Sequence, residues 1–296
     1  MSPAPHIYTL TGNLLAERTL EFTSWAPGKT QRAIRESFQV GGKGINVSKM
    51  LNRLGAPNTA LCFAGGSSGA ECEAWLRERG FAHRVFATDR ATRTGTVVRA
   101  PNTPETTFLG SDVVPTASAI VACAQFLDAQ PDGHILAICG SVPGWAGSEF
   151  APLRHAIERW ATRGVVAADT YGPPLEWLST QPLALVKINA AEFAAFGAGA
   201  ADPAAGLAQA LARFPVRSWI ISDGPKPVWF ASKSLAPTSV TPPLVREVSA
   251  TGSGDVLFAC VLDALFCRGT DLSTAVVAAL PRAAANAAHP GIAEFP

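Results

Sequence analysis

Short apolar segments alternate along this chain with longer segments of helical periodicity, and this alternation constrains the fold more than any other feature. We expect strands at residues 59–64, 134–139, 164–168, 183–188 and 218–222, a hairpin-like stretch at 228–230, and helices at 69–79, 149–162, 204–214, 255–267 and 273–288. Strands that are apolar on both faces are typical of a parallel sheet covered by helices on each side. The sequence therefore predicts an α/β fold with a mostly parallel central sheet, and ligand sites in the loops that follow its strands.

Two segments interrupt this alternation. Residues 14–40 and 92–109 are richer in threonine, arginine and alternating residues, so we expect them to form antiparallel strands of a small flap outside the main sheet. A chain of 296 residues fits one α/β domain, 1–296, with a small β-sheet lid, better than two independent domains.

The charge balance limits the partners that the surface can bind. Lysine and arginine number 24 against 23 aspartates and glutamates, a formal charge of +1, whereas nucleic acids and anionic membranes are normally bound through a basic face. The longest apolar stretch, 256–267, contains Asp263 and at about 12 residues is too short to span a bilayer. We therefore expect neither a nucleic acid nor a membrane as partner.

Two further features bear on the cellular compartment. The N-terminal residues lack a basic start followed by an apolar core and a cleavage site, so we expect no signal peptide. The six cysteines, at positions 62, 72, 123, 139, 260 and 267, include no Cys-x-x-Cys pair and no histidine at metal-binding spacing. We expect free buried thiols and a cytoplasmic protein.

The first motif with chemical content is the glycine-rich run 41–46, which precedes a segment of helical character. Glycines allow backbone to approach a ligand closely, a helix start offers unpaired N–H groups, and Lys43 adds a positive charge. The run is not a Walker A loop, because no serine or threonine follows Gly-Lys at the required spacing. Taken alone, it is as often a structural turn as a ligand site.

The second motif, 250–255, leads directly into the apolar segment that follows it. Backbone N–H groups around Gly252 and Gly254 at a helix start would form an anion cradle. Asp255, placed at that cradle, could take the proton of a hydroxyl that attacks a phosphoryl group. The structural alternative is a helix cap, for which Ser253 or Asp255 is suited.

Two shorter patterns could assist the same chemistry. Asn189 and Glu192 lie three residues apart at a strand end, where they would face the same way and could orient a hydrated Mg²⁺ and phosphates, or simply form a capping box. Arg93 in the flap could bind phosphate oxygens in a bidentate manner, although a lone arginine is more often a solvated surface residue.

A rival pattern belongs to another class of enzyme. Residues 65–69 fit Gly-x-Ser-x-Gly between a strand and a helix, the context of a nucleophile elbow, and Ser67 would then be the nucleophile. Asp169 and His289 follow in the order of a hydrolase triad. No His-Gly-Gly-type oxyanion segment precedes them, which weakens this hypothesis.

The first four motifs occur in an order and at separations that resemble the phosphofructokinase-B (pfkB) family of carbohydrate kinases, which have a three-layer ribokinase-like fold. Nearly the whole chain takes part, and the similarity is greatest to the branch acting on phosphorylated hexoses, such as 1-phosphofructokinase and tagatose-6-phosphate kinase. The resembling segments are 9–17, 27–32, 41–46, 139–143, 187–192, 222–224 and 252–255.

The resemblance implies an ATP-dependent kinase that uses Mg²⁺. The proton acceptor would be Asp255, beside the phosphoryl-binding residues Gly252, Ser253 and Gly254. The ATP phosphates and nucleotide would be held by Lys187, Asn189, Glu192, Ser222 and Gly224, with Asn189 and Glu192 reaching the metal through water. The sugar would be held by Glu17, Gly42, Lys43, Asn46, Arg93 and Ser141, with the two cations favouring its phosphate. The small sheet would be a lid that excludes water and that in relatives often pairs between subunits, which implies a possible homodimer.

Several positions depart from the family pattern. Glu17 stands where an aspartate usually binds sugar hydroxyls, and Arg282 lies beside the expected adenine site. The acceptor therefore stays open among fructose 1-phosphate, fructose 6-phosphate and tagatose 6-phosphate. Alternatives are a kinase of an unphosphorylated sugar or nucleoside, and a non-catalytic sensor of sugar phosphates or nucleotides.

Overall fold

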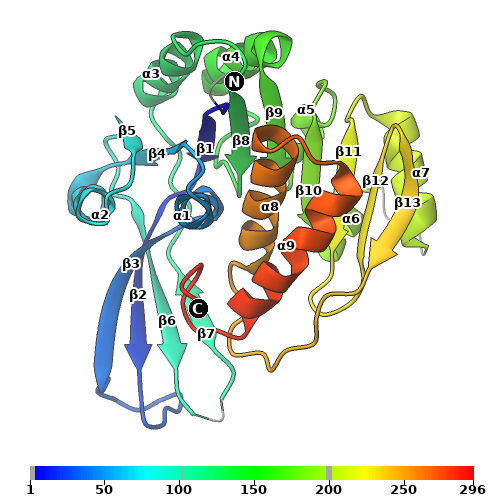
Figure 1. The fold of residues 1–296 in the computed structure, drawn as a ribbon. Helices are drawn as coiled ribbons and strands as arrows, with labels where there is room; N and C mark the ends of the chain where they lie inside the picture. Colours follow the sequence, from blue (N-terminus) through cyan, green and yellow to red (C-terminus); the bar gives the residue numbers. More distant parts are fainter. Residues whose placement is uncertain (1–3, 102, 198–201) are drawn as a thin grey trace.

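The computed structural model describes residues 4–101, 103–197 and 202–296, which form a large and a small sheet with helices around them (Figure 1). The large sheet has the strand order β13-β12-β11-β10-β9-β8-β1-β4-β5. From β11 to β5 every neighbouring pair is parallel, and β12 and β13 add an antiparallel hairpin at one edge. The expected α/β fold with a mostly parallel central sheet is confirmed.

The elements follow one another as the alternation predicts. The strands of the large sheet are β1 Ile7–Thr11, β4 Asn58–Ala64, β5 His83–Ala87, β8 Ile135–Cys139, β9 Val165–Asp169, β10 Leu185–Asn189, β11 Ser218–Ser222, β12 Val228–Ser232 and β13 Leu235–Val240. The helices are α1 Lys43–Leu54, α2 Gly66–Glu78, α3 Ala117–Asp128, α4 Ala151–Arg163, α5 Pro173–Leu178, α6 Ala190–Ala195, α7 Pro203–Arg213, α8 Ser253–Leu262 and α9 Leu272–Ala287.

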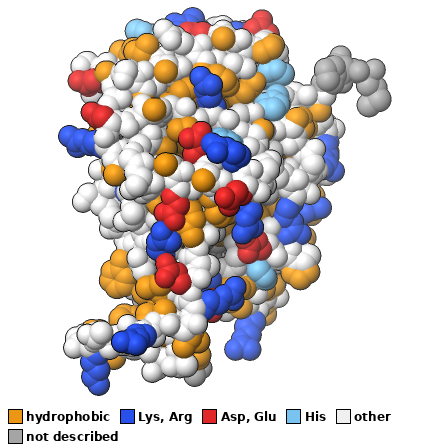
Figure 2. All heavy atoms as spheres, turned by 90° about the vertical axis from the view of Figure 1, so that its left-hand side faces the viewer, with side chains coloured by type: hydrophobic (Ala, Val, Ile, Leu, Met, Phe, Trp, Pro, Cys, Tyr) orange, Lys and Arg blue, Asp and Glu red, His pale blue; other side chains and the backbone are white. Residues whose placement is uncertain are grey.

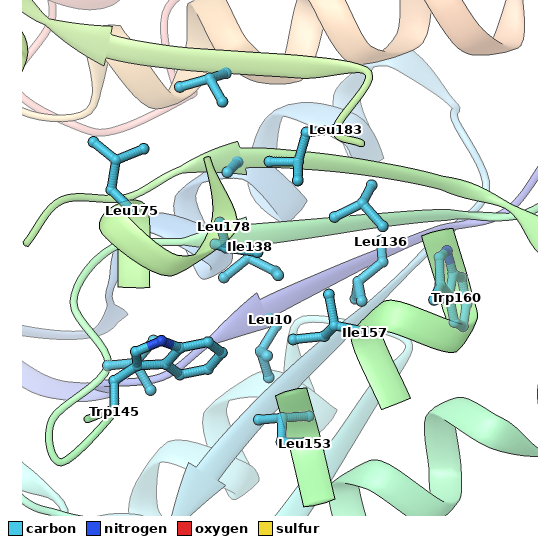
Figure 3. Packing of buried hydrophobic residues seen from close by; sticks show 14 of the residues in the cluster. Leu10, Leu136, Ile138, Trp145, Leu153, Ile157, Trp160, Leu175, Leu178 and Leu183 are labelled. Atoms are coloured by element: carbon cyan, nitrogen blue, oxygen red, sulfur yellow. The ribbon is translucent and has the colours of Figure 1, made fainter. Parts of the chain in front are cut away.

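Helices cover both faces of the large sheet because its strands are apolar on both. In β8, Leu136 and Ile138 belong to the core beneath α3 to α7, whereas Ile135 and Ala137 pack in the core beneath α1, α8 and α9. Figure 3 shows the first of these cores, where Trp160 of α4 packs near Leu136. Burial of this much apolar surface on each face makes the sheet a rigid base for the loops at its ends.

The small sheet consists of β2 Leu15–Glu21, β3 Arg35–Gly41, β6 Arg93–Arg99 and β7 Thr106–Leu109, in the order β3-β2-β6-β7. Its two outer pairings are antiparallel, and the central pairing of β2 with β6 is parallel. It projects from one side of the molecule, with the C-terminal segment beside it (Figure 1). Arg99 fastens the two together by donating to the carbonyl of Pro290 at 2.8 Å.

Some elements were not expected from the sequence. β1 carries buried threonines, β5 is half-exposed, and α3 is rich in alanine, so their apolar patterns are weak. The expected helix at 255–267 is α8 followed by a π-helical turn, Asp263–Cys267. None of the described helices is long and apolar enough to cross a membrane.

Candidate active site

The carboxyl ends of the parallel strands line up at one edge of the large sheet and bring the predicted motifs together. In the strand register Cys139 lies beside Asp169, and Asn189 lies beside Ser222. A cavity of about 470 Å³ opens over this edge. Its lining includes residues of the two glycine-rich motifs and of segments 187–192 and 222–224: Lys43, Asn46, Lys187, Asn189, Ser222, Gly224, Gly252, Ser253, Gly254 and Asp255.

The turn before α8 depends on its glycines. Gly252 is the N-terminal cap with φ 79°, in the left-handed region, and a Cβ there would lie 2.5 Å from Ile292. A Cβ on Gly254 would lie 2.5 Å from Nζ of Lys187. The backbone thus passes close to the lysine, and first-turn amides of a helix have no partner within it. Among the described residues no side chain caps the helix, so the amides of its first turn are left for another partner.

A buried asparagine in α9 holds this turn in place. The Asn286 side chain is fully buried; its Nδ2 donates to the carbonyl of Thr251 at 3.0 Å and to Oγ of Ser253 at 3.1 Å. Its Oδ1 accepts from the amide of Ala293 at 2.8 Å. Ser253 is therefore tied to α9 and does not cap its own helix.

Asp255 lies in the first turn of α8, almost wholly buried at 5% exposure. Its Oδ2 accepts from Nδ2 of Asn46 at 2.7 Å. Burial, with repulsion from Asp169, raises the pKa of Asp255 to about 6, although Lys43 and Lys187 act in the opposite direction. Near neutral pH this carboxylate is ionised and can accept a proton.

Asp169 at the end of β9 organises the two lysines of the cavity. Its Oδ1 accepts from Nζ of Lys43 at 2.7 Å and its Oδ2 accepts from Nζ of Lys187 at 2.8 Å. Burial alone would raise the pKa of Asp169, but the two lysines outweigh it and lower the pKa. Two cations thus converge on one buried carboxylate beside Asp255, and Lys43 also contacts Oε1 of Glu192 at 3.0 Å.

Asn189 and Glu192 form a capping box at the start of α6. Oδ1 of Asn189 accepts from the amide of Glu192 at 2.8 Å, and Oε2 of Glu192 accepts from the amide of Asn189 at 2.9 Å. Both residues therefore have structural roles, although Asn189 also lines the cavity. Within the described part of the chain no three His, Cys, Asp or Glu side chains are grouped as metal ligands. This donor set fits a cation held mainly by phosphates and water, with these side chains outside its first layer.

Part of the wall of the cavity, contributed by β12 and α9, is apolar. This part includes Val228, Leu280, Ala283, Ala284 and Ala287, with Ser222 and Gly224 nearby. Such a surface suits a flat aromatic base. Arg282, expected beside this region, is exposed and lines other hollows on the outer side of α9.

At the junction with the small sheet, Glu17 takes part in a buried chain of side chains. Glu17 accepts a short hydrogen bond from Nε2 of Gln39, and Oε1 of Gln39 accepts from Nζ of Lys49 at 2.8 Å. Burial lowers the pKa of Lys49 to about 8, although Glu17 acts in the opposite direction. Strands β2 and β3 are in this way fastened to helix α1.

Arg93 begins β6 and is largely enclosed, with its side chain 13% exposed. Nη1 donates to Oδ1 of Asp112 at 3.1 Å, and Nη2 donates to the carbonyl of Asn13 at 3.3 Å. The side-chain Nδ2 of Asn13 donates to the same Asp112 oxygen at 2.7 Å and to Oγ of Ser141 at 2.9 Å. Arg93 and Ser141 thus belong to one cluster, and Arg93 is not a solvated surface residue.

The Gly-x-Ser-x-Gly run has a structural role, and the hydrolase alternative is wrong. Ser68, and not Ser67, uses its hydroxyl, which donates to the carbonyl of Thr92 at 2.7 Å and so positions the start of β6. Both oxygens of Asp169 are taken by lysines. His289 accepts from the amide of Gly291 at 3.0 Å. Among the described contacts none joins the three expected triad members.

Several residues of the site are not recognisable in the sequence, because each is a single polar residue in an ordinary segment. Asn286 stands among alanines, and a polar residue inside an apolar helix is the one signal that could have found it. The others carry no local signal: Asn13, Gln39, Lys49 and Asp112. Their importance comes from partners far away in the chain, as with Asn13 and Asp112, which are 99 positions apart.

Residues 13–295 match the pfkB family of carbohydrate kinases. This chain belongs to that family. It is 29% identical over 277 residues to a 1-phosphofructokinase of Xanthomonas campestris pv. campestris, covering 89% of this chain and 85% of the relative. It is 26% identical over 293 residues to a 1-phosphofructokinase of Borreliella burgdorferi, covering 98% of this chain and 94% of that relative.

The fold of this carbohydrate kinase matches a solved relative. Phosphofructokinase-2 from Escherichia coli, in complex with substrates and products, superimposes with a TM-score of 0.88 at 22% identity, covering 98% of this chain and 95% of that one. The expected family and ribokinase-like architecture are therefore confirmed, and the kinases of this family use ATP.

Proposed function

We propose that this kinase transfers the γ-phosphoryl group of ATP to a hydroxyl of a hexose phosphate, with Asp255 as the general base. The observation that carries the proposal is the position of Asp255, which is buried at the first turn of α8 beside two glycines and hydrogen-bonded to Asn46. The alignments with two 1-phosphofructokinases, over most of both chains, support a phosphorylated hexose as acceptor.

The reaction proceeds as follows. The sugar hydroxyl gives its proton to Asp255, its oxygen bonds to the γ-phosphorus, and the bond from that phosphorus to the β-phosphate oxygen breaks, releasing ADP. Amides around Gly252, Ser253 and Gly254 stabilise the negative charge on the phosphoryl group in transit. Lys43 and Lys187, held at one carboxylate, add positive charge there. Lys43 therefore acts on the transferred phosphoryl group, and Arg93 binds the phosphate that the sugar already carries.

ATP enters as its magnesium complex, whose ion is carried by the phosphates. Asn189 and Glu192 would orient it through water, because both are already engaged in the capping box. The apolar part of the cavity wall, with Ser222 and Gly224, would take the base.

The sugar would lie between the sheet edge and the small sheet, which acts as the lid. Glu17, Gly42 and Asn46 would face its hydroxyls, and Arg93, with Ser141 in the same cluster, would face its phosphate. The lid would exclude water and so limit hydrolysis of ATP. Exposed apolar side chains at the edges of the lid, Ile34 and Phe108 among them, support a homodimer that covers them.

The compartment proposed for the enzyme is the cytoplasm. All six cysteines are free thiols, and five of them are buried. Burial raises the pKa of Cys72 to about 12, so this thiol stays protonated and unreactive. The surface in Figure 2 shows basic and acidic side chains interspersed, consistent with small-molecule substrates.

The deciding experiment measures ADP release with MgATP over a panel of fructose 1-phosphate, fructose 6-phosphate, tagatose 6-phosphate, fructose and a nucleoside. We expect one of the phosphates to give the highest kcat/KM, and Asp255→Ala to abolish the stimulation. Preference for fructose or the nucleoside would show a kinase of neutral acceptors. Binding without turnover would show a sensor.

A further inference from the structure

Arg93, the residue expected to bind the phosphate of the substrate, already forms an ion pair with a carboxylate of the protein, that of Asp112. Asp112 lies in the loop between β7 and α3 and borders a hollow of about 670 Å³ that also includes Ser141 and Tyr171. Building on the function proposed above, we propose that Asp112 is a specificity-determining residue, which competes with the anionic group of the sugar for the side chain of Arg93.

The geometry places Asp112 where such a group would make its contacts. A single oxygen, Oδ1, accepts from Nη1 of Arg93 at 3.1 Å and from the side-chain amide of Asn13 at 2.7 Å. A phosphate offers the same features as this carboxylate, acceptor oxygens with a negative charge. The two groups therefore require the same donors.

The Arg93 side chain is held in its position by burial and by a backbone contact. Its Nη2 donates to the backbone carbonyl of Asn13, its Nε is buried without a partner among the described residues, and its side chain is 13% exposed. The residue before it, Thr92, is tied to the Gly65–Ser68 turn by its amide and carbonyl groups. Asp112 is 60% exposed on a loop. When an anion binds at Arg93, Asp112 is therefore the partner that gives way.

The competition affects charged and neutral acceptors differently. An incoming phosphate must displace the carboxylate and then stay near a like charge, whereas a neutral sugar meets neither penalty. Asp112 thus weakens binding of sugar phosphates relative to neutral sugars, chiefly through its charge.

Asp112→Asn tests this directly, because asparagine removes the charge and keeps an accepting Oδ1 for Arg93 and Asn13, while its second oxygen, which makes neither of these bonds, becomes an NH2 group. Two readouts are used: KM at saturating MgATP, and Kd from calorimetry without nucleotide, each for the three hexose phosphates and for fructose. We expect KM and Kd for the accepted hexose phosphate to fall about fivefold, the scale of a partly exposed ion pair, with the values for fructose unchanged. Asp112→Ala, a second variant, should also lower them.

Two control variants separate the effect of a charge at position 112 from the effects of side-chain size and of the net charge of the protein. Asp112→Glu keeps the charge and should keep KM at or above the wild-type value. Asp132→Asn removes an equal charge from a pair with Arg163, where it is 76% exposed on the surface, and should change neither constant. Thermal unfolding of each variant confirms that it is folded.

The outcomes distinguish this inference from the proposed function. If the wild-type enzyme accepts a hexose phosphate but Asp112→Asn and Asp112→Ala leave its Kd unchanged or raise it, Asp112 is no competitor and the inference is wrong. If the wild-type enzyme phosphorylates fructose and none of the three phosphates, the proposed function is itself overturned, and the inference with it.

Discussion

The side-chain amide of Asn46, in α1, donates a 2.7 Å hydrogen bond to Oδ2 of Asp255, 209 positions away in α8. This bond joins the two glycine-rich motifs, and among the described residues it is the only hydrogen bond of the Asp255 side chain, so Oδ1 is the oxygen proposed to accept the proton. Because an amide donor supports the ionised form of a carboxylate, Asn46 limits the rise in pKa that burial of Asp255 causes.

The first prediction concerns pH. A general base must be deprotonated, and the pKa of Asp255 is raised to about 6, so kcat/KM should be constant above pH 7 and fall tenfold per unit below about pH 6. Asp255→Asn should lower kcat by about 10²–10⁴-fold. The measurement is steady-state ADP release from pH 5 to 9. An acid limb that persists unchanged in the residual activity of Asp255→Asn would assign the pKa to another group.

The same pKa predicts an effect on stability. In the folded state the pKa lies above the unfolded value of 3.8, so the ionised form is disfavoured by folding. This cost is absent below about pH 4 and complete above about pH 6. Because a shift from 3.8 to about 6 corresponds to roughly 3 kcal/mol, Asp255→Asn should be more stable than wild type at pH 8 and equal to it at pH 4. Denaturant unfolding at both pH values measures the difference.

Asp169 offers a test of the electrostatic coupling. Repulsion from Asp169 raises the pKa of Asp255, so Asp169→Asn should move the acid limb of kcat/KM to lower pH. The variant also leaves Lys43 and Lys187 without their shared carboxylate, which should cost about 3–5 kcal/mol of stability. The pH profile is therefore measured at low temperature, after circular dichroism has verified folding. An acid limb that stays at about 6 would show that burial alone sets the pKa.

The sequence predicted the architecture and the residues of the cavity better than the residues near the small sheet, where the sugar is proposed to bind. Strand positions follow from apolar runs. Gly252 and Gly254 are recognisable because a position where the backbone passes close to another group requires glycine. Lys43 is recognisable too, but its ion pair with Asp169 joins residues 126 positions apart. The sequence therefore could not predict which group the Lys43 side chain contacts. The cluster of Asn13, Arg93 and Asp112 exists only once the small sheet docks on the large one. Nothing local marks such residues, because their neighbours are chosen by tertiary packing.

Asn286 is predicted to position the anion cradle without touching substrate. Asn286→Ala removes its bonds to Thr251 and Ser253 and leaves buried groups unpaired, which should cost about 1–3 kcal/mol of stability. We expect kcat to fall while KM for the sugar changes little. Arg282→Ala, on the outer side of the same helix, is the control and should leave kcat unchanged. A fall in stability with full kcat would limit Asn286 to a folding role.

Glu17 gives the last prediction. Glu17→Asp keeps the charge and withdraws the carboxylate by one methylene, about 1 Å or more, and displacements of that size strongly affect reactions that depend on orientation. If Glu17 binds the sugar hydroxyls, KM for the sugar phosphate should rise about tenfold while KM for MgATP stays constant. Glu21→Asp, on the same strand and paired with Arg35, is the matched control. An unchanged sugar KM, together with a lower melting temperature, would mean that Glu17 serves only to hold Gln39 and, through it, Lys49.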